Sequence, residues 1–160
     1  MKNLFTKYLP EFVYGSTDGT VTTFAVVSGI AGAALSPTIV LVLGLANVLA
    51  DGFSMACSNY LSERSKNSKL RASLETSLAT FFAFVLVGLI PLLPYIFYPS
   101  SDDVFYVSCI LTAFTFIGIG FIKGKIVGKN KFYSAVETLL VGGAAASIAY
   151  IVGFLLKGLV

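Results

Sequence analysis

Two acidic side chains, Asp18 and Asp51, lie inside stretches of the chain that are otherwise apolar. An ionised acid at the centre of a membrane costs between about 2.5 and more than 10 kcal/mol, so such residues seldom face lipid. They face the interior of a helix bundle, a cavity or a partner. Each acid could bind a cation or a proton. The alternative is that each bonds a neighbouring Ser or Thr and serves packing alone.

Possible metal ligands recur at every fourth residue around Asp51. Asn47, Asp51, Met55 and Asn59 would stack along one face of a helix. Carboxylate and amide oxygens suit hard divalent cations, and a thioether shifts the preference toward softer first-row metals such as Fe²⁺. Together with Asp18, this stripe predicts a transit site for a first-row divalent metal. Met55 taken alone is more often a core residue.

Further residues flank these acids. Glu11 precedes Asp18 by seven residues, which places both on one helix face, and Gly15 and Gly19 form a Gly-x-x-x-Gly pattern around Asp18. That pattern lets a second helix approach closely. Glu137 lies near the start of the last apolar stretch, where it either caps a helix or serves as an entrance for metal ions or protons.

The elements that must position these residues are membrane-spanning helices. The chain has 160 residues, 56% of them hydrophobic and 12% charged, with a mean hydropathy of +0.87. Soluble domains carry roughly 25% charged residues. A helix of about 20 mostly apolar residues crosses the hydrocarbon core. Five stretches within a single transporter domain, 1–160, qualify, and they are residues 12–35, 38–61, 77–97, 104–122 and 134–156.

The connecting segments predict the orientation. With the N-terminus in the cytoplasm, ten of the eleven basic residues lie on the inner side and only Lys157 lies outside. Asp102 and Asp103 fall in an outer loop. The predicted fold class is an all-α membrane protein with five transmembrane helices, a cytoplasmic N-terminus and a C-terminus on the opposite side. The inner basic residues are Lys2, Lys7, Arg64, Lys66, Lys69, Arg71, Lys123, Lys125, Lys129 and Lys131.

The composition argues against several kinds of chemistry. The chain has no histidine, which removes Ser-His and Cys-His dyads, His-ligated zinc and His-ligated haem. Cys57 and Cys109 lack the spacing of a redox or metal motif, so they are interpreted as small hydrophobic residues. The basic residues lie in short loops, and no nucleic-acid partner is expected. We expect neither an enzyme nor a bound cofactor.

Three segments resemble the vacuolar iron transporter family. "YGSTDGTVTTFAVVSGIAGA" (14–33) resembles the first-helix signature of the family, and "ANVLADGFSMACSNYLSERS" (46–65) resembles the second-helix signature. "FYSAVETLLVGGAAASIAYIVG" (132–153) is similar to the fifth helix, with a looser match. Together with the five predicted spans, the resemblance covers most of the chain.

The resemblance implies a homodimer of five-helix protomers that moves Fe²⁺, and often Mn²⁺, out of the cytosol in exchange for protons. The pathway lies at the dimer interface and is lined by the first helices. Carried over to this sequence, Asp18 matches the transport acid of the first helix and Met55 matches the methionine of the second. Glu11 falls where the family has an acid near the cytoplasmic mouth.

Two departures from the family pattern bear on the mechanism. Plant members have a Glu where this chain has Asn47, and Asp51 lies one turn further on as the acid that would replace it. The Glu-rich cytoplasmic metal-binding domain between the second and third helices is missing, as in the shorter, nodulin-like branch. Metal capture would then depend on Glu11, Glu63, Glu75 or Glu137.

We therefore expect an integral, multi-pass membrane protein that exports Fe²⁺ and/or Mn²⁺ from the cytosol by proton exchange at a dimer interface. Its partners would be metal ions, protons, the lipid bilayer and a second copy of the chain. One alternative is a membrane scaffold or assembly protein without transport, and another is a channel or exchanger for a cation such as Ca²⁺. The expected membrane is the plasma membrane of a prokaryote, or the vacuolar membrane in a eukaryote.

Overall fold

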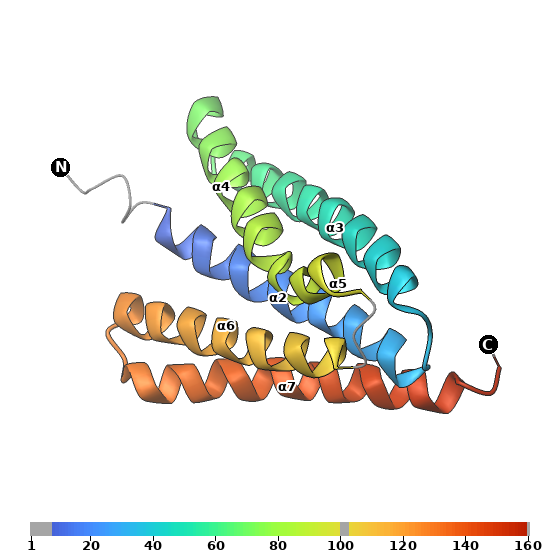
Figure 1. The fold of residues 1–160 in the computed structure, drawn as a ribbon. Coiled ribbons are helices and arrows are strands. Elements are labelled where there is room, and N and C mark those ends of the chain that lie inside the picture. Colours follow the sequence, from blue (N-terminus) through green and yellow to red (C-terminus); the bar gives the residue numbers. More distant parts are fainter. Residues whose placement is uncertain (1–7, 100–102, 160) are drawn as a thin grey trace.

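Helices account for nearly all of the residues that the computed structural model describes, which are 8–99 and 103–159. These residues contain no β-strand, so the all-α prediction is confirmed for this part of the chain. Lys2, Lys7 and Asp102, which the orientation prediction uses, lie outside the described residues. The helices, shown in Figure 1, are α2 (Leu9–Gly32), α3 (Pro37–Ser65), α4 (Leu70–Gly88), the short 3₁₀ helix η1 (Ile90–Leu92), α5 (Leu93–Phe97), α6 (Val104–Val127) and α7 (Lys131–Leu156).

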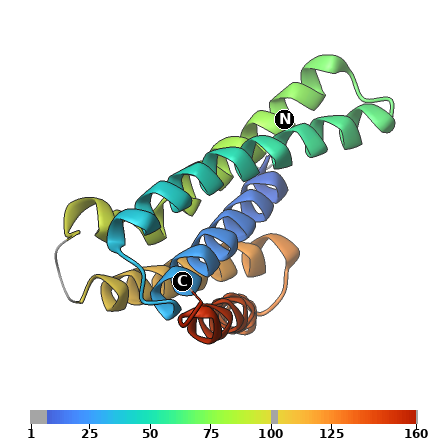
Figure 2. The same cartoon turned by 90° about the vertical axis from the view of Figure 1, so that its right-hand side faces the viewer.

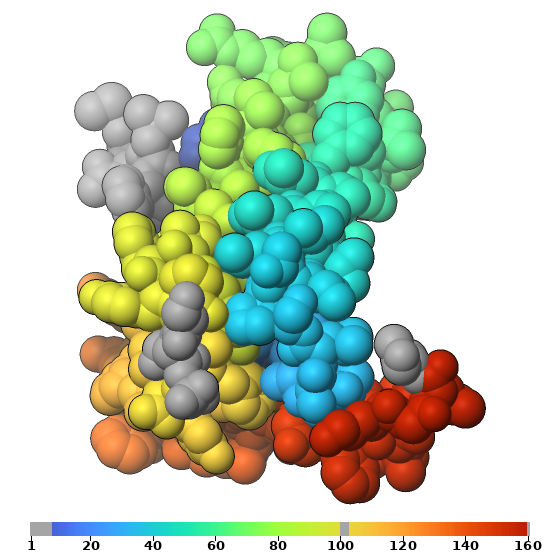
Figure 3. Space-filling model, turned by 45° about the vertical axis from the view of Figure 1, so that its right-hand side comes forward, coloured from blue at the N-terminus to red at the C-terminus, as the bar shows by residue number. Residues whose placement is uncertain are grey.

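The central helix of the bundle is α2. It passes between a pair formed by α3 and α4 and a second pair formed by α6 and α7 (Figures 1 and 2), and its most extensive contacts are with α4 and α7. The space-filling view shows α3 on the outside of the molecule (Figure 3). Side chains on α2 are therefore mostly surrounded by other helices, which decide what each of them meets.

Glycines let α2 and α4 approach until their backbones touch. A Cβ atom added to Gly15 would lie 2.6 Å from the carbonyl oxygen of Thr80, and one added to Gly19 would lie 2.5 Å from that of Phe84. Real Cβ atoms essentially never come that close to another atom. The Gly-x-x-x-Gly pattern thus serves packing within one chain, and α4 occupies the face of α2 that carries both glycines.

Four helical stretches in the described residues are long and apolar enough to cross a membrane, namely α3, the stretch from α4 through α5 (Leu70–Phe97), α6 and α7. The 24 residues of α2 include the fully buried Ser16, Thr20 and Thr23. Because its neighbours are other helices, α2 does not need a uniformly apolar surface. These helices make the chain an integral membrane protein. The fifth span, predicted over residues 12–35, remains a prediction.

The third predicted span differs most from the helix in the structure. α4 begins at Leu70, well before the expected start at residue 77. An ion pair between Arg71 Nε and Glu75 Oε1, one turn apart at 2.9 Å, supports the added turns. The other helices agree more closely with the predicted spans, although α3 and α6 each continue past the predicted end, to Ser65 and Val127.

The prolines interrupt this third stretch, as predicted. α4 ends at Gly88, and the chain continues through η1 into α5. Pro91 and Pro94 lack the backbone N–H that a continuous helix requires. The hydroxyl of Ser108 on α6 donates to the carbonyl oxygen of Pro91 at 2.7 Å, so the break is also tied to a neighbouring helix.

The turns that carry basic residues lie at one end of the bundle. Figure 1 shows the α3–α4 turn and the α6–α7 turn at the same end as the first residues of α2, whereas the α2–α3 connection and the end of α7 lie at the other end. All of the described Lys and Arg residues except Lys157 lie in or near these two turns. We call this the basic end. That it faces the cytoplasm stays a prediction.

Candidate functional site

Asp18 and Asp51 are brought near each other at mid-height of the bundle. Asp18 lies in the first half of α2, Asp51 is the central residue of α3, and both side chains are half-buried. The two carboxylates are close enough for their charges to interact. Within residues 8–99 and 103–159, no hydrogen bond or ion pair reaches either carboxylate. Two like charges without a counter-charge in a membrane favour a bound cation or proton.

The packing interpretation of Asp18 required a bond to a neighbouring hydroxyl group. Thr22, one helical turn after Asp18, instead donates to the backbone carbonyl oxygen of Asp18 at 2.9 Å. Thr17 likewise donates to a backbone carbonyl of its own helix, that of Val13, at 2.7 Å. The carboxylate of Asp18 is therefore left available for a ligand.

The stripe on α3 divides into residues with different tasks. Asn59 Nδ2 donates to the Thr80 hydroxyl on α4 at 2.8 Å, which ties the two helices together. Met55 is buried, with 9% of its surface exposed. Asn47 is half-buried, and its Nδ2 atom is buried without a hydrogen-bond partner in the described structure. Asn47, Asp51 and Met55 are thus the members of the stripe whose polar atoms remain unpaired.

A cleft opens between the start of α2 and the second half of α3, at the basic end. Its volume is about 430 Å³. We call it the mouth cleft. It brings Glu11 and Met55 together, while Asp18 does not line it, and one carboxylate oxygen of Glu11, Oε2, is buried there without a partner. The lining residues are Pro10, Glu11, Tyr14, Met55, Ser58, Asn59, Ser62, Glu63 and Lys66.

Glu63 in the mouth cleft is already neutralised. Its Oε1 atom pairs with Lys66 Nζ at 2.8 Å, and its Oε2 atom accepts a hydrogen bond from the Ser68 hydroxyl at 3.1 Å. Glu63, one of the acids that the sequence offers for metal capture, lines the same cleft as Glu11. Residue 63 also continues the fourth-residue spacing of Asn47, Asp51, Met55 and Asn59.

Glu137 lies apart from the mouth cleft. It is exposed on α7 and pairs with Lys123 on α6, Oε2 to Nζ, at 2.9 Å. It does not cap α7, because Asn130 Oδ1 accepts from the backbone N–H of Phe132 at 2.9 Å. No hydrogen bond or ion pair among the described residues joins Glu137 to Asp18 or Asp51, and its role as an entrance for metal ions or protons stays a prediction.

Comparison with known proteins gives a family match over most of the chain. A model of the VIT family matches residues 9–77 and 67–154. The two matched ranges overlap at residues 67–77, which include the α3–α4 turn and the start of α4. The chain is a short form that lacks the cytoplasmic domain.

Several curated relatives are similar along their length. A vacuolar iron transporter from Toxoplasma gondii is 27% identical over 230 aligned positions, which cover 97% of this chain and 76% of the relative. One from Centaurea cyanus is 26% identical and covers 88% and 84%. Vacuolar iron transporter 1 of Arabidopsis thaliana is 24% identical and covers 88% and 82%. The aligned positions outnumber the residues of this chain, so these relatives carry extra segments.

Proposed function

Because the chain belongs to the VIT family, we propose that it carries Fe²⁺ or Mn²⁺ out of the cytosol through the membrane. The pair formed by Asp18 and Asp51 carries this proposal: two interacting carboxylates at mid-height, with no hydrogen bond or ion pair to either in the described residues. A divalent cation would supply the missing counter-charge. The relatives described above are named vacuolar iron transporters, which supports a metal ion as the cargo.

In the proposed path the metal enters at the mouth cleft and moves to the acid pair. Glu11 offers a buried, unpartnered carboxylate oxygen, and Met55 lines the cleft one helical turn from Asp51. Met55 therefore links the cleft to the acid pair, with Asn47 one turn beyond. A thioether beside carboxylates favours Fe²⁺ over harder ions such as Ca²⁺.

Proton exchange follows from the same pair. One set of carboxylates cannot hold a proton and a divalent cation at the same atoms, so protons arriving from the far side would release the metal. Asp18 and Asp51 are only half-buried within one chain. In the proposed homodimer, a second copy covers this side and completes the path.

The test is uptake of Fe²⁺, Mn²⁺, Zn²⁺ and Ca²⁺ into proteoliposomes, with and without a pH gradient. We expect uptake of Fe²⁺ or Mn²⁺ that is stimulated by the gradient and is nearly abolished by Asp18→Asn. Asp103→Asn, the same change outside the site at the start of α6, is the matched control. Gel filtration and circular dichroism must show that each variant is folded.

Three outcomes would contradict the proposal. Full uptake by Asp18→Asn would remove the acid from the mechanism. Uptake confined to Ca²⁺ would indicate an exchanger or channel for a hard cation. No uptake of any metal by the folded wild-type chain would favour the scaffold alternative.

A further inference from the structure

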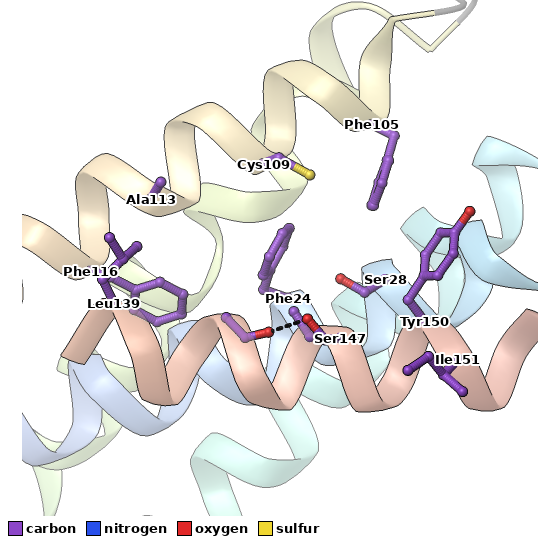
Figure 4. A pocket seen from close by; sticks show the side chains of 12 residues that line it. Phe24, Ser28, Phe105, Cys109, Ala113, Phe116, Leu139, Ser147, Tyr150 and Ile151 are labelled. Atoms are coloured by element: carbon purple, nitrogen blue, oxygen red, sulfur yellow. Dashed lines mark hydrogen bonds between the residues drawn. The ribbon is translucent and has the colours of Figure 1, made fainter. Parts of the chain in front are cut away.

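A groove lies between α6 and α7 with α2 as its floor (Figure 4), and neither Asp18 nor Asp51 lines it. Its volume is about 410 Å³. Most of its lining is apolar, with Phe105 near one end and Phe116 and Leu139 near the other. Ligand-binding pockets typically have a volume of this size and a mostly apolar lining with a few polar groups at defined positions. We call it the α6–α7 groove.

One polar group in the groove lacks a partner. Ser28 is 2% exposed, and its hydroxyl oxygen is buried without a hydrogen-bond partner in the described structure. Figure 4 shows this hydroxyl group directed into the groove. Ser147, which also lines the groove, is satisfied because it donates to the carbonyl oxygen of Gly143 at 2.7 Å. A buried hydroxyl group of this kind favours a ligand that offers a hydrogen-bond acceptor.

The groove begins near the end of the bundle opposite the basic end. Phe105 is the second residue of α6, and Ser28 lies four residues before the end of α2. Phe116 lies near the middle of α6, and the 1.5 Å rise per residue gives a length of about 16 Å from Phe105 to Phe116. The polar atom therefore lies near the membrane boundary and the apolar end lies at mid-height. A volume of 410 Å³ over that length suits one thin chain, whereas a helix is about 10–12 Å wide.

From this arrangement we propose that the α6–α7 groove binds one acyl chain of a phospholipid from the leaflet opposite the basic end. The acyl chain runs toward Phe116, and the Ser28 hydroxyl donates to its ester carbonyl oxygen. The two walls of the groove, α6 and α7, are among the helices apolar enough to span a membrane, so the medium around them is acyl chains. This inference concerns binding of lipid and does not depend on the proposed transport.

Gly143 allows the groove to be filled without disturbing the fold. A Cβ atom at this position would meet no atom within 4 Å, and the same holds for Gly118 on the exposed side of α6, which does not line the groove. Gly143→Leu is therefore the filling variant and Gly118→Leu is its matched control. Ala113→Leu, on the opposite wall, is a second filling variant, and Ser28→Ala removes the donor.

The experiment uses the full chain in nanodiscs that contain a phosphatidylcholine with a photoreactive diazirine on one acyl chain. After irradiation, labelled peptides are identified by mass spectrometry. We expect the wild type and Gly118→Leu to be labelled mainly on α6 and α7 residues of the groove, and Gly143→Leu and Ala113→Leu to lose most of that label. Ser28→Ala should reduce it about 2- to 10-fold, the effect of one hydrogen bond.

A second measurement follows the melting temperature in detergent as the same phospholipid is added. A lipid bound to the folded state should raise it for the wild type and Gly118→Leu but not for the filling variants. Equal labelling of Gly143→Leu and wild type, or label spread evenly over α3 and α4, would overturn the proposal. So would a crosslink between two chains through Cys109, because a second copy would then occupy the groove.

Discussion

At the level of single residues, the chemistry rests on side chains that have no partner of their own. Asp18, Asp51 and one oxygen of Glu11 lack partners in the described structure, whereas Glu63 and Glu137 are each paired with a lysine. Uncompensated charge in a membrane is costly and is found where a ligand binds. The unpaired acids are therefore the sites where substitutions should change transport rather than folding.

Asp51→Asn should weaken metal binding without abolishing it. Asp18 would remain as a charged ligand, while one charge-assisted interaction is lost, and we expect KM for Fe²⁺ or Mn²⁺ to rise about tenfold or more. Initial rates of uptake over a range of metal concentrations give this value. Asp51→Glu, which keeps the charge, is the control. An unchanged KM in Asp51→Asn would show that Asp18 binds the metal without it.

Met55→Leu should change selectivity more than rate. Leucine has a similar volume, so the buried position should remain packed, but the thioether is lost. We expect Ca²⁺ and Mg²⁺ to compete several-fold better against Fe²⁺, because only oxygen and amide ligands remain. Competition assays in proteoliposomes measure this ratio. If the ratio is the same in the variant, the sulfur does not contact the metal.

At the level of helices, the position of every site residue depends on how closely α2 packs against α4. Gly15 and Gly19 allow contact between the two backbones, and the Asn59–Thr80 hydrogen bond joins α3 to the same helix. α4 carries none of the residues predicted to bind the metal within the membrane, which are Asp18, Asn47, Asp51 and Met55. It nevertheless holds the two helices that carry Asp18 and Asp51 in register.

Gly19→Ala should destabilise the fold. Its new Cβ atom would lie 2.5 Å from the Phe84 carbonyl oxygen, and overpacking of this kind costs about 1–3 kcal/mol in the free energy of unfolding. Unfolding in detergent, followed by circular dichroism, measures the loss. Gly118→Ala, whose Cβ atom would meet nothing within 4 Å, should leave stability nearly unchanged. Equal stability of both variants would mean that α2 and α4 are further apart than described.

For the whole molecule, the positions of the basic turns and of the mouth cleft favour the same orientation in the membrane. The two basic turns lie at the same end of the bundle (Figure 1), and basic residues favour the cytoplasmic side. The mouth cleft opens at this end, and the α6–α7 groove lies toward the other. The proposed entry of metal from the cytosol is consistent with this predicted orientation.

Single cysteines can test the orientation. In a chain with Cys57 and Cys109 replaced by serine, Lys69→Cys and Lys129→Cys should react with a membrane-impermeant maleimide from the cytoplasmic side of sealed vesicles. Ser36→Cys, in the α2–α3 connection, should react only from the opposite side. Labelling of Lys69→Cys and Lys129→Cys from different sides would contradict both the helix arrangement and the orientation.

The sequence by itself determined the local properties of the chain. The helices could be predicted because apolar length and proline act over neighbouring residues, as the break at Pro91 and Pro94 shows. The sequence also predicted the high free-energy cost of placing Asp18 and Asp51 in the membrane, because this cost depends on the apolar residues around each acid. The predicted span begins at residue 77 rather than at Leu70 because the first turns of α4 are polar and include the Arg71–Glu75 ion pair, so apolar length does not reveal them.

Only the tertiary structure decided which residues meet. It set α4 of the same chain against Gly15 and Gly19, joined Glu11 to Met55 in the mouth cleft, and paired Glu137 with Lys123. It also left Ser28 unpartnered in the α6–α7 groove. Helical periodicity fixes which face a residue shares with its neighbours in the chain, but the helix that covers that face depends on packing between segments far apart in the sequence.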